Sequence, residues 1–293
     1  MTSYVVSFPI RDTVVRSDNN IPWVLAMHSN VVSIFSCFRR AAATCRSISC
    51  NTGNDLSLWA KERVLAPYIS SERRNRIERV LENRTRNVVV VLEHLHSKGN
   101  ENAVYRSMDA LGFQEAHSIT ADEESEAGQA SGDPRTDAGA RKWLQIRKWH
   151  TTRDCLLHLK SRGYQIIATA MNNRDNSSLP VQDVDFDNKI AFVFGAEKDG
   201  VSDLAVEMAD VCCFIPMIGF TQSFNVSVAA ALILYETRMR RIRMFGRNGD
   251  LTDEEKRSLL VEFYVRALTS SKARRVLQKY KYDATDSSMT ENI

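Results

Sequence analysis

Short apolar runs alternate with amphipathic segments over much of the chain after residue 86. The first run, NVVVVL at residues 87–92, is continuous and rich in β-branched residues, which is typical of a strand buried on both faces of a parallel sheet. Further apolar runs predict strands at residues 116–120, 164–170, 190–194 and 211–215, and helical spacing predicts helices at 102–111 and 152–162. Strands that alternate with helices predict an α/β fold, with a mostly parallel sheet and helices on both of its faces.

The rest of the chain divides around this core. We expect a domain at residues 56–245 that includes a helical lead-in (56–86) and a hydrophilic insert (121–145), followed by a C-terminal helical extension (246–293). The insert is rich in Glu, Ser, Gly and Asp, a composition that favours a loop. In the extension, Thr252 and Glu255 have the spacing of a capping box, which predicts a helix that begins there.

Residues 1–55 differ from the rest in composition. Between residues 19 and 54 no acidic residue occurs, and three arginines stand among several serines. This composition suits an organellar transit peptide, so we expect a mitochondrial protein. Asp12 and Asp18 fit the alternative better, in which the segment is a disordered extension of a cytoplasmic protein.

The net charge of +3 is small for 293 residues, so contact with a nucleic acid must come from a local patch. Residues 59–82 carry apolar residues among many charges, which predicts one or two amphipathic helices. Arg73, Arg74 and Arg76 lie in this stretch and are candidates for contact with RNA phosphates. A solvated helix face explains the same arginines equally well.

The cysteines and the apolar runs argue against a metal-binding protein and against a membrane protein. None of the six cysteines forms a C-x-x-C pair or stands at metal-ligand spacing with histidines, so we expect reduced thiols and no metal site. No apolar stretch approaches the roughly 20 residues that span a bilayer, so we expect no membrane contact.

Ligands of parallel sheets usually bind beyond the carboxyl ends of the strands, so chemistry is expected after Ala170, Phe194 and Ile215. The loop from Gly195 to Gly200 has two glycines but lacks the Lys-Ser/Thr pair of a phosphate-binding P-loop. These glycines allow a positive φ angle and a close approach to a ligand, or they serve an ordinary turn.

Three segments carry a longer pattern. They are NVVVVLEHLHSKGNENAVYRSMDALG from Asn87, IAFVFGAEKDGVS from Ile190 and IPMIGFTQSFNVSVAAALILYE from Ile215. Within the third, Asn225 precedes a helical run of small residues, which places it to cap a helix and to present its amide to a ligand. In this order the segments resemble the three motifs of the SpoU class of SPOUT methyltransferases, most closely the tRNA-modifying TrmH subfamily.

The resemblance implies a fold and a reaction. It implies a deep trefoil knot in the C-terminal half and a dimer, formed with a second copy or with a paralogue. It also implies S-adenosylmethionine as the cofactor. The implied methyl acceptor is a ribose 2′-hydroxyl of structured RNA, either a tRNA D-loop guanosine or rRNA. Base methylation is disfavoured, because the Asn-Val-Ser-Val-Ala segment belongs to the ribose-modifying enzymes.

The resemblance also implies roles for residues at matching positions. The implied catalytic residues are Arg106, Asn100, Glu197, Ser223 and Asn225, and the implied cofactor contacts are Thr169, Gly195, Gly200, Ile215 and Phe224. In related enzymes the arginine reaches the cofactor site of the other subunit. Because an arginine stays protonated in proteins, we expect Arg106 to bind the RNA phosphate beside the target ribose rather than to act as a base.

Two residues depart from the family pattern. Ala196 stands where Asn or Gln usually follows the first glycine, and Phe224 stands where Leu usually follows the serine. These departures motivate a second hypothesis. In it, the protein keeps the fold but binds RNA as a catalytically impaired factor in mitochondrial ribosome assembly.

Overall fold

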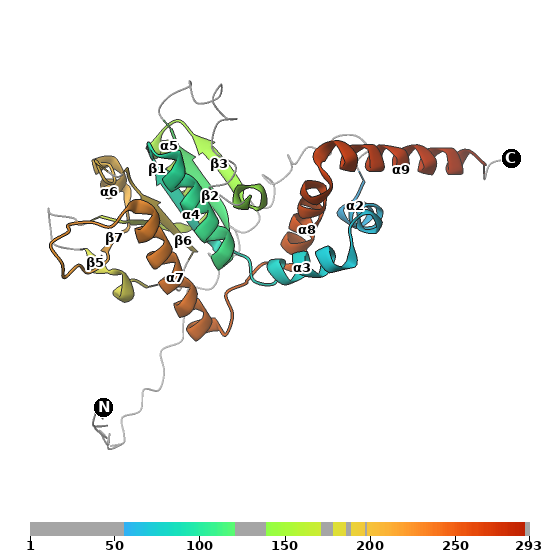
Figure 1. The fold of residues 1–293 in the computed structure, drawn as a ribbon. Helices are drawn as coiled ribbons and strands as arrows, with labels where there is room; N and C mark the ends of the chain where they lie inside the picture. Colours follow the sequence, from blue (N-terminus) through green and yellow to red (C-terminus); the bar gives the residue numbers. More distant parts are fainter. Residues whose placement is uncertain (1–55, 121–138, 171–177, 186–188, 197, 291–293) are drawn as a thin grey trace, which may run out of the picture. The chain divides into compact units, whose positions relative to one another are not determined.

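The computed structural model describes residues 56–120, 139–170, 178–185, 189–196 and 198–290, with only the backbone of residues 281–290. The expected transit segment, most of the expected insert and Glu197 lie outside these residues. Seven parallel strands of the described chain form a sheet in the order β3-β2-β1-β6-β4-β7-β5 (Figure 1). They are β1 (Thr85–Glu93), β2 (Phe113–Ile119), β3 (Gln145–Trp149), β4 (Tyr164–Ala168), β5 (Leu179–Pro180), β6 (Lys189–Phe194) and β7 (Val211–Phe214).

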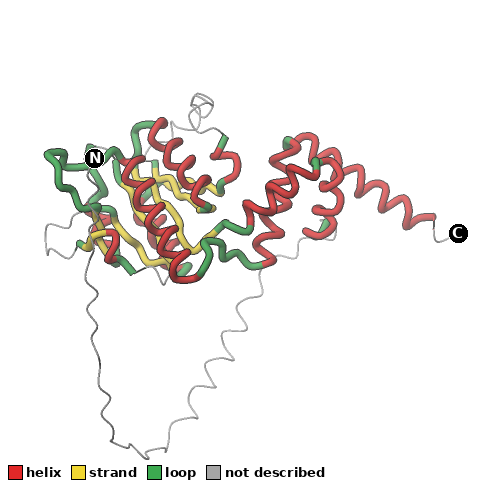
Figure 2. Tube along the Cα trace, turned by 60° about the horizontal axis from the view of Figure 1, so that its bottom comes forward, coloured by secondary structure: helices red, strands yellow, loops and turns green. Residues whose placement is uncertain are grey.

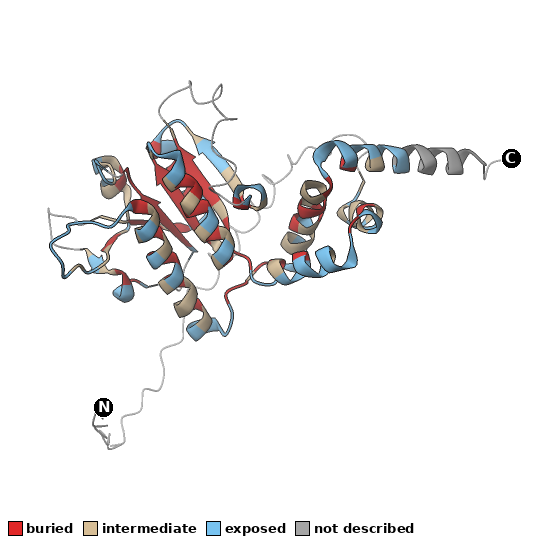
Figure 3. Cartoon of the chain, viewed as in Figure 1, coloured by how far each residue is buried: buried red, intermediate tan, exposed pale blue. Residues whose placement is uncertain are grey.

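The valines of β1 divide between the two faces of the sheet. Val88 and Val90 pack in one apolar cluster with residues of α4 and α7, whereas Val89 and Val91 pack in another with residues of α5 and α6. These helices are α4 (Lys98–Leu111), α5 (Thr152–Ser161), α6 (Asp203–Met208) and α7 (Val226–Phe245). The apolar residues of the central strands β1 and β6 are buried (Figure 3), so the predicted parallel sheet with helices on both faces is confirmed.

Four helices from the two ends of the described chain pack together (Figure 2). They are α2 (Leu58–Leu65), α3 (Ser71–Leu81), α8 (Asp253–Leu268) and α9 (Ser270–Thr290). Leu65, Leu259 and Phe263 lie in their shared apolar cluster. The predicted capping box at the start of α8 is confirmed. Glu255 N donates to Thr252 Oγ1 at 3.2 Å, and Thr252 N donates to the Glu255 carboxylate at 2.9 Å.

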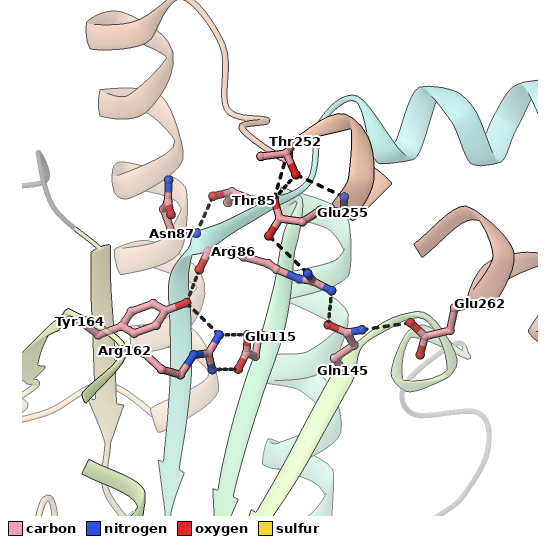
Figure 4. Close-up of polar contacts among 10 residues, drawn as sticks. All are labelled: Thr85, Arg86, Asn87, Glu115, Gln145, Arg162, Tyr164, Thr252, Glu255 and Glu262. Carbon is pink, nitrogen blue, oxygen red and sulfur yellow. Dashed lines mark hydrogen bonds and ion pairs between the residues drawn. The ribbon is translucent and has the colours of Figure 1, made fainter. Parts of the chain in front are cut away.

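Polar contacts connect α8 to the amino ends of β1 and β3 (Figure 4). Arg86 of β1 pairs with Glu255 of α8 at 3.3 Å and donates to the Gln145 side chain of β3 at 2.8 Å. Gln145 in turn donates to Glu262 of α8 at 3.0 Å. These contacts hold α8 against the sheet.

Two strands are absent from the sequence prediction. β3 lies at the edge of the sheet, and three of its five residues are polar, so it lacks the apolar run of a central strand. The end of the expected hydrophilic insert (121–145) is occupied by η3 (Ala140–Trp143) and the first residue of β3. β5 is too short to show a pattern. The trefoil knot stays a prediction. Among the described helices, none has the length and apolar character needed to cross a membrane.

Candidate active site

A cavity of about 270 Å³ opens beyond the carboxyl ends of β4, β6 and β7, where a parallel sheet is expected to bind its ligand. Its walls come from these strand ends, the loop after β6, the segment after β7 and the first turns of α7. The lining residues are Thr169, Ala170, Phe194, Gly195, Ala196, Gly200, Val201, Cys213, Phe214, Ile215, Met217, Gln222, Ser223, Phe224, Val226, Ala229 and Ile233. None of these described residues carries a charged side chain, and most are apolar or small.

The two glycines of the loop after β6 are needed for different reasons. Gly200 has a φ angle of 73°, in the left-handed region that favours glycine. Gly195 provides space, because a Cβ atom there would lie 1.9 Å from Gly200 O. Gly200 N also donates to Ala196 O at 2.9 Å and closes the loop. The loop is thus a tight turn whose backbone forms part of the cavity wall.

All five residues expected to contact the cofactor line this single cavity. Thr169 follows β4, and its hydroxyl donates to Val193 O at 2.8 Å, which fixes the side chain beside β6. Ile215 directly follows β7. Phe224 is 41% exposed, so it stands where the cavity meets solvent. Strand ends and loops that are distant in the sequence therefore supply one site.

The two asparagines expected to be catalytic contact each other. Asn225 is the N-cap of α7, where its Oδ1 accepts from Ser227 N at 3.0 Å, so the predicted cap is confirmed. Asn225 Nδ2 donates to Asn100 Oδ1, on α4, at 3.3 Å. Ser223, two residues before Asn225, lines the cavity. The third sequence segment and the helix of the first segment thus meet at the cavity edge.

Arg106 does not line the cavity of its own chain. It lies on α4, six residues after Asn100, and its side chain is exposed. Among the described residues it has no hydrogen-bond or ion-pair partner. Glu197 is outside the described residues. The structure therefore brings Asn100, Ser223 and Asn225 together, but it leaves Arg106 free to reach something outside this chain.

Glu93, the last residue of β1, is a buried polar residue that the sequence patterns do not single out. It is 1% exposed and accepts hydrogen bonds from Thr152 and Ser202. The available signal is a carboxylate at the end of a fully apolar run, because acidic residues are rarely buried unless they are paired.

The three arginines expected to contact RNA separate on α3. Arg73 and Arg76 line a second cavity, of about 590 Å³, together with Arg79. The guanidinium groups of these three residues have no partner in the described part of the chain. Arg74 instead donates to Ala66 O at 3.5 Å. The structure thus groups Arg73 and Arg76 with Arg79 and places Arg74 apart.

Cys213 forms part of the wall of the first cavity and is a free thiol. Burial, with a smaller effect of the neighbouring Cys212, raises the pKa of the Cys213 thiol to about 12. The thiol is therefore protonated and unreactive at neutral pH. In the residues that the structure describes, no group of three or more His, Cys, Asp or Glu side chains is placed to hold a metal ion.

A parallel sheet with a loop-built cavity at its carboxyl edge, lined in the described residues by apolar and small side chains, is typical of α/β proteins that bind a small organic ligand. The chain belongs to the SpoU rRNA Methylase family, whose sequence pattern matches residues 87–235. The family consists of RNA 2′-O-methyltransferases that use S-adenosylmethionine. The protein is therefore a methyltransferase with this cofactor.

Relatives match the chain over most of their own length. The tRNA (guanosine(18)-2′-O)-methyltransferase of Borreliella burgdorferi is 32% identical over 219 residues, which cover 75% of this chain and 92% of the relative. The enzyme of the same name from Thermus thermophilus is 38% identical over 171 residues, covering 58% of this chain and 84% of the relative. The crystal structure of the Aquifex aeolicus TrmH/SpoU tRNA modifying enzyme has a TM-score of 0.60 and 32% identity, and the match covers 68% of this chain and 98% of that one.

The cavity fits the adenosine part of S-adenosylmethionine. An adenine ring is flat and uncharged, and it is suited to apolar walls such as those of Phe194 and Ile215. The hydroxyls of Thr169 and Ser223 and the backbone of the loop after β6 supply polar groups. The volume of about 270 Å³ is just below the roughly 300–1,000 Å³ common for ligand sites, which suits a part of the cofactor.

Proposed function

We propose that the protein transfers a methyl group from S-adenosylmethionine to the ribose 2′-hydroxyl of a guanosine in tRNA. The relatives described above are named for guanosine 18 of tRNA, which motivates this target over rRNA. One observation carries the proposal. Asn100 and Asn225 contact each other beside the cavity that all five expected cofactor residues line.

In this proposal the chain positions the acceptor ribose. S-adenosylmethionine supplies the methyl group when it is bound. Arg106 binds the phosphate next to the target ribose through two parallel hydrogen bonds. Asn100, on the same helix as Arg106, and Asn225, beside the cavity, orient the 2′-hydroxyl, with Ser223 at the cavity wall. Holding the acceptor in line removes much of the entropic part of the barrier.

The proposal includes a dimer in which Arg106 serves the cavity of the other subunit. Its exposure and its position away from its own cavity support this arrangement. Several large apolar side chains are exposed on the segment before α7 and on α7 itself. Leu232 and Tyr235 are exposed on the same side of α7, and Ile218 and Phe220 are fully exposed in the preceding segment. Because such apolar surface is a typical site of association, we propose that a second copy, or a paralogue, covers it.

The cavity beside α3 is the proposed contact for another part of the RNA. Arg73, Arg76 and Arg79 recur every three residues, so their side chains are neighbours on the helix surface. Unpaired guanidinium groups attract phosphates, and Trp143, which also lines this cavity, offers an aromatic surface for a base. A contact outside the active site would add affinity for a large RNA without taking part in methyl transfer.

A catalytically impaired RNA-binding factor is the second candidate. Ala196 is buried in the cavity wall where the family usually has an amide, and Phe224 stands at its edge. Isothermal titration with S-adenosylmethionine, followed by a transfer assay on tRNA with labelled cofactor, separates the two functions. The enzyme binds the cofactor and labels the tRNA, whereas the factor binds tRNA or the cofactor without transfer.

We also propose that residues 1–55 direct the protein to mitochondria. The absence of acidic residues between positions 19 and 54 supports this proposal. A fluorescent protein fused to residues 1–55 is expected to enter mitochondria, and the full chain without this segment is expected to stay in the cytoplasm. A cytoplasmic fusion would contradict the proposal.

A further inference from the structure

Glu93 contacts the end of the loop that lines the cofactor cavity. Its Oε2 accepts from Ser202 N at 2.9 Å, and its Oε1 accepts from Ser202 Oγ at 2.7 Å. Ser202 directly follows Gly200 and Val201, and both of these residues line the cavity. A shift of Ser202 would therefore move part of the cavity wall. Glu93 itself is not among the lining residues.

The same carboxylate also contacts an element that takes no part in the cavity. Thr152 Oγ1, at the start of α5, donates to Glu93 Oε1 at 2.5 Å. Ser202 Oγ in addition accepts from Ala205 N at 3.1 Å and caps α6. Glu93 of β1 thus connects Ser202, at the end of the loop, to the start of α5, and Ser202 also caps α6.

The chain on the other side of Glu93 leads to the expected catalytic residues. His94 has a φ angle of 52°, which non-glycine residues rarely adopt, and its N–H donates to Ile119 O at 3.0 Å. Ser97 then caps α4, the helix that carries Asn100. Glu93 therefore contacts the end of the cofactor loop and directly precedes the chain segment that leads to Asn100.

We propose that Glu93 is a positioning residue for the cofactor, which holds Gly200 and Val201 in the cavity wall through Ser202. This inference rests on the proposed function in one respect, namely that the cavity is the cofactor site. Three hydrogen bonds satisfy a carboxylate that is 1% exposed, and two of the three come from the residue that ends the loop. Removing the charge leaves the part-buried Ser202 N–H with a weaker partner.

The test compares variants on the two sides of the carboxylate in the full-length protein. Glu93→Gln weakens the contact to the loop and leaves the Ser202 cap of α6 intact, whereas Thr152→Ala removes only the contact to α5. We expect Glu93→Gln to raise the Kd and the KM for S-adenosylmethionine about tenfold, equivalent to about 1.4 kcal/mol, with kcat at saturating cofactor within about threefold. Thr152→Ala should leave the Kd within about twofold.

Two outcomes overturn the positioning role. In one, Thr152→Ala raises the Kd as much as Glu93→Gln does, which would mean that the carboxylate stabilises the fold in general and does not position the loop. In the other, Glu93→Gln leaves the Kd unchanged. Amide hydrogen exchange of residues 200–202 gives a readout that needs no cofactor, and it should accelerate in Glu93→Gln but not in Thr152→Ala. If the wild type fails to bind S-adenosylmethionine, the proposed function fails, and the exchange rates still decide the role of Glu93.

Discussion

Asn225 Nδ2 donates to Asn100 Oδ1 over 3.3 Å, while Asn225 Oδ1 caps α7 by accepting from Ser227 N. The oxygen of the Asn225 amide therefore caps a helix, while its nitrogen makes a contact in the candidate active site. Asn225→Asp keeps the capping oxygen and loses the amide donor. We expect its free energy of unfolding to change by less than about 0.5 kcal/mol, because Asn and Asp cap about equally well. Methyl transfer should fall at least about tenfold.

Asn225→Ala is the matched control for this prediction, since it loses both contacts. Its unfolding free energy should fall by about 1 kcal/mol, measured by urea denaturation, and its activity should fall as in Asn225→Asp. If Asn225→Asp retains full activity, the amide has no role in the reaction and Asn225 is only a helix cap.

The arginines of α3 offer a comparison within a single helix. Arg76→Glu places a negative charge in the cavity beside Arg73 and Arg79, whereas Arg74→Glu makes the same change outside it. We expect Arg76→Glu to raise the Kd for tRNA at least about tenfold and to reduce its salt dependence, with cofactor affinity unchanged. Filter binding at several salt concentrations measures both effects. Equal losses in the two variants would show that only net charge matters.

Mixed dimers test whether Arg106 serves the other subunit. Arg106→Ala removes the phosphate contact, and Gly195→Val blocks the cofactor loop, because a side chain at position 195 meets Gly200 O. Each variant alone should be inactive. Together they should regain activity, because the mixed dimer holds one cavity with an intact Gly195 and an arginine supplied by its partner. Absence of recovery in dimers shown by mass measurement to be mixed would place Arg106 in its own subunit's site.

The free energy of unfolding is expected to depend on pH through the carboxyl group of Glu115. Burial raises the pKa of its carboxyl, but the hydrogen bonds from His117 and Arg162 outweigh burial and lower the pKa from 4.5 to about 2. The folded-state pKa lies below the unfolded one, so this stabilisation is present above about pH 5 and is lost as the pH falls toward about 2.

Glu115→Gln removes this titration. The stability difference between wild type and variant, measured as urea midpoints, should be larger at about pH 7 than at about pH 3. A difference that stays constant between the two pH values would contradict the lowered pKa.

The central strands and the cavity residues could be predicted from the sequence because their signals are local. The run VVVVL at residues 88–92 is apolar throughout since β1 is covered on both faces, and Gly195, Gly200 and Asn225 belong to contiguous motifs. β3 could not be predicted in this way, because an edge strand need not be apolar on both faces.

Other features depend on residues far apart in the chain. Glu93 and Ser202 are separated by more than 100 residues, and no local pattern shows that they meet. Arg73 and Arg74 are adjacent in sequence, but consecutive residues of a helix point in directions about 100° apart. Only the structure shows which of these two arginines lines the cavity.

The most direct test of the proposed reaction is nucleoside analysis by mass spectrometry. Unmodified tRNA is incubated with S-adenosylmethionine and either the wild type or Arg106→Ala, then digested to nucleosides. We expect one 2′-O-methylguanosine per tRNA with the wild type and none with Arg106→Ala, although this variant should bind the cofactor within about threefold of wild type. A base-methylated nucleoside, or no methylated nucleoside with wild-type protein that binds both cofactor and tRNA, would contradict ribose 2′-O-methylation of tRNA.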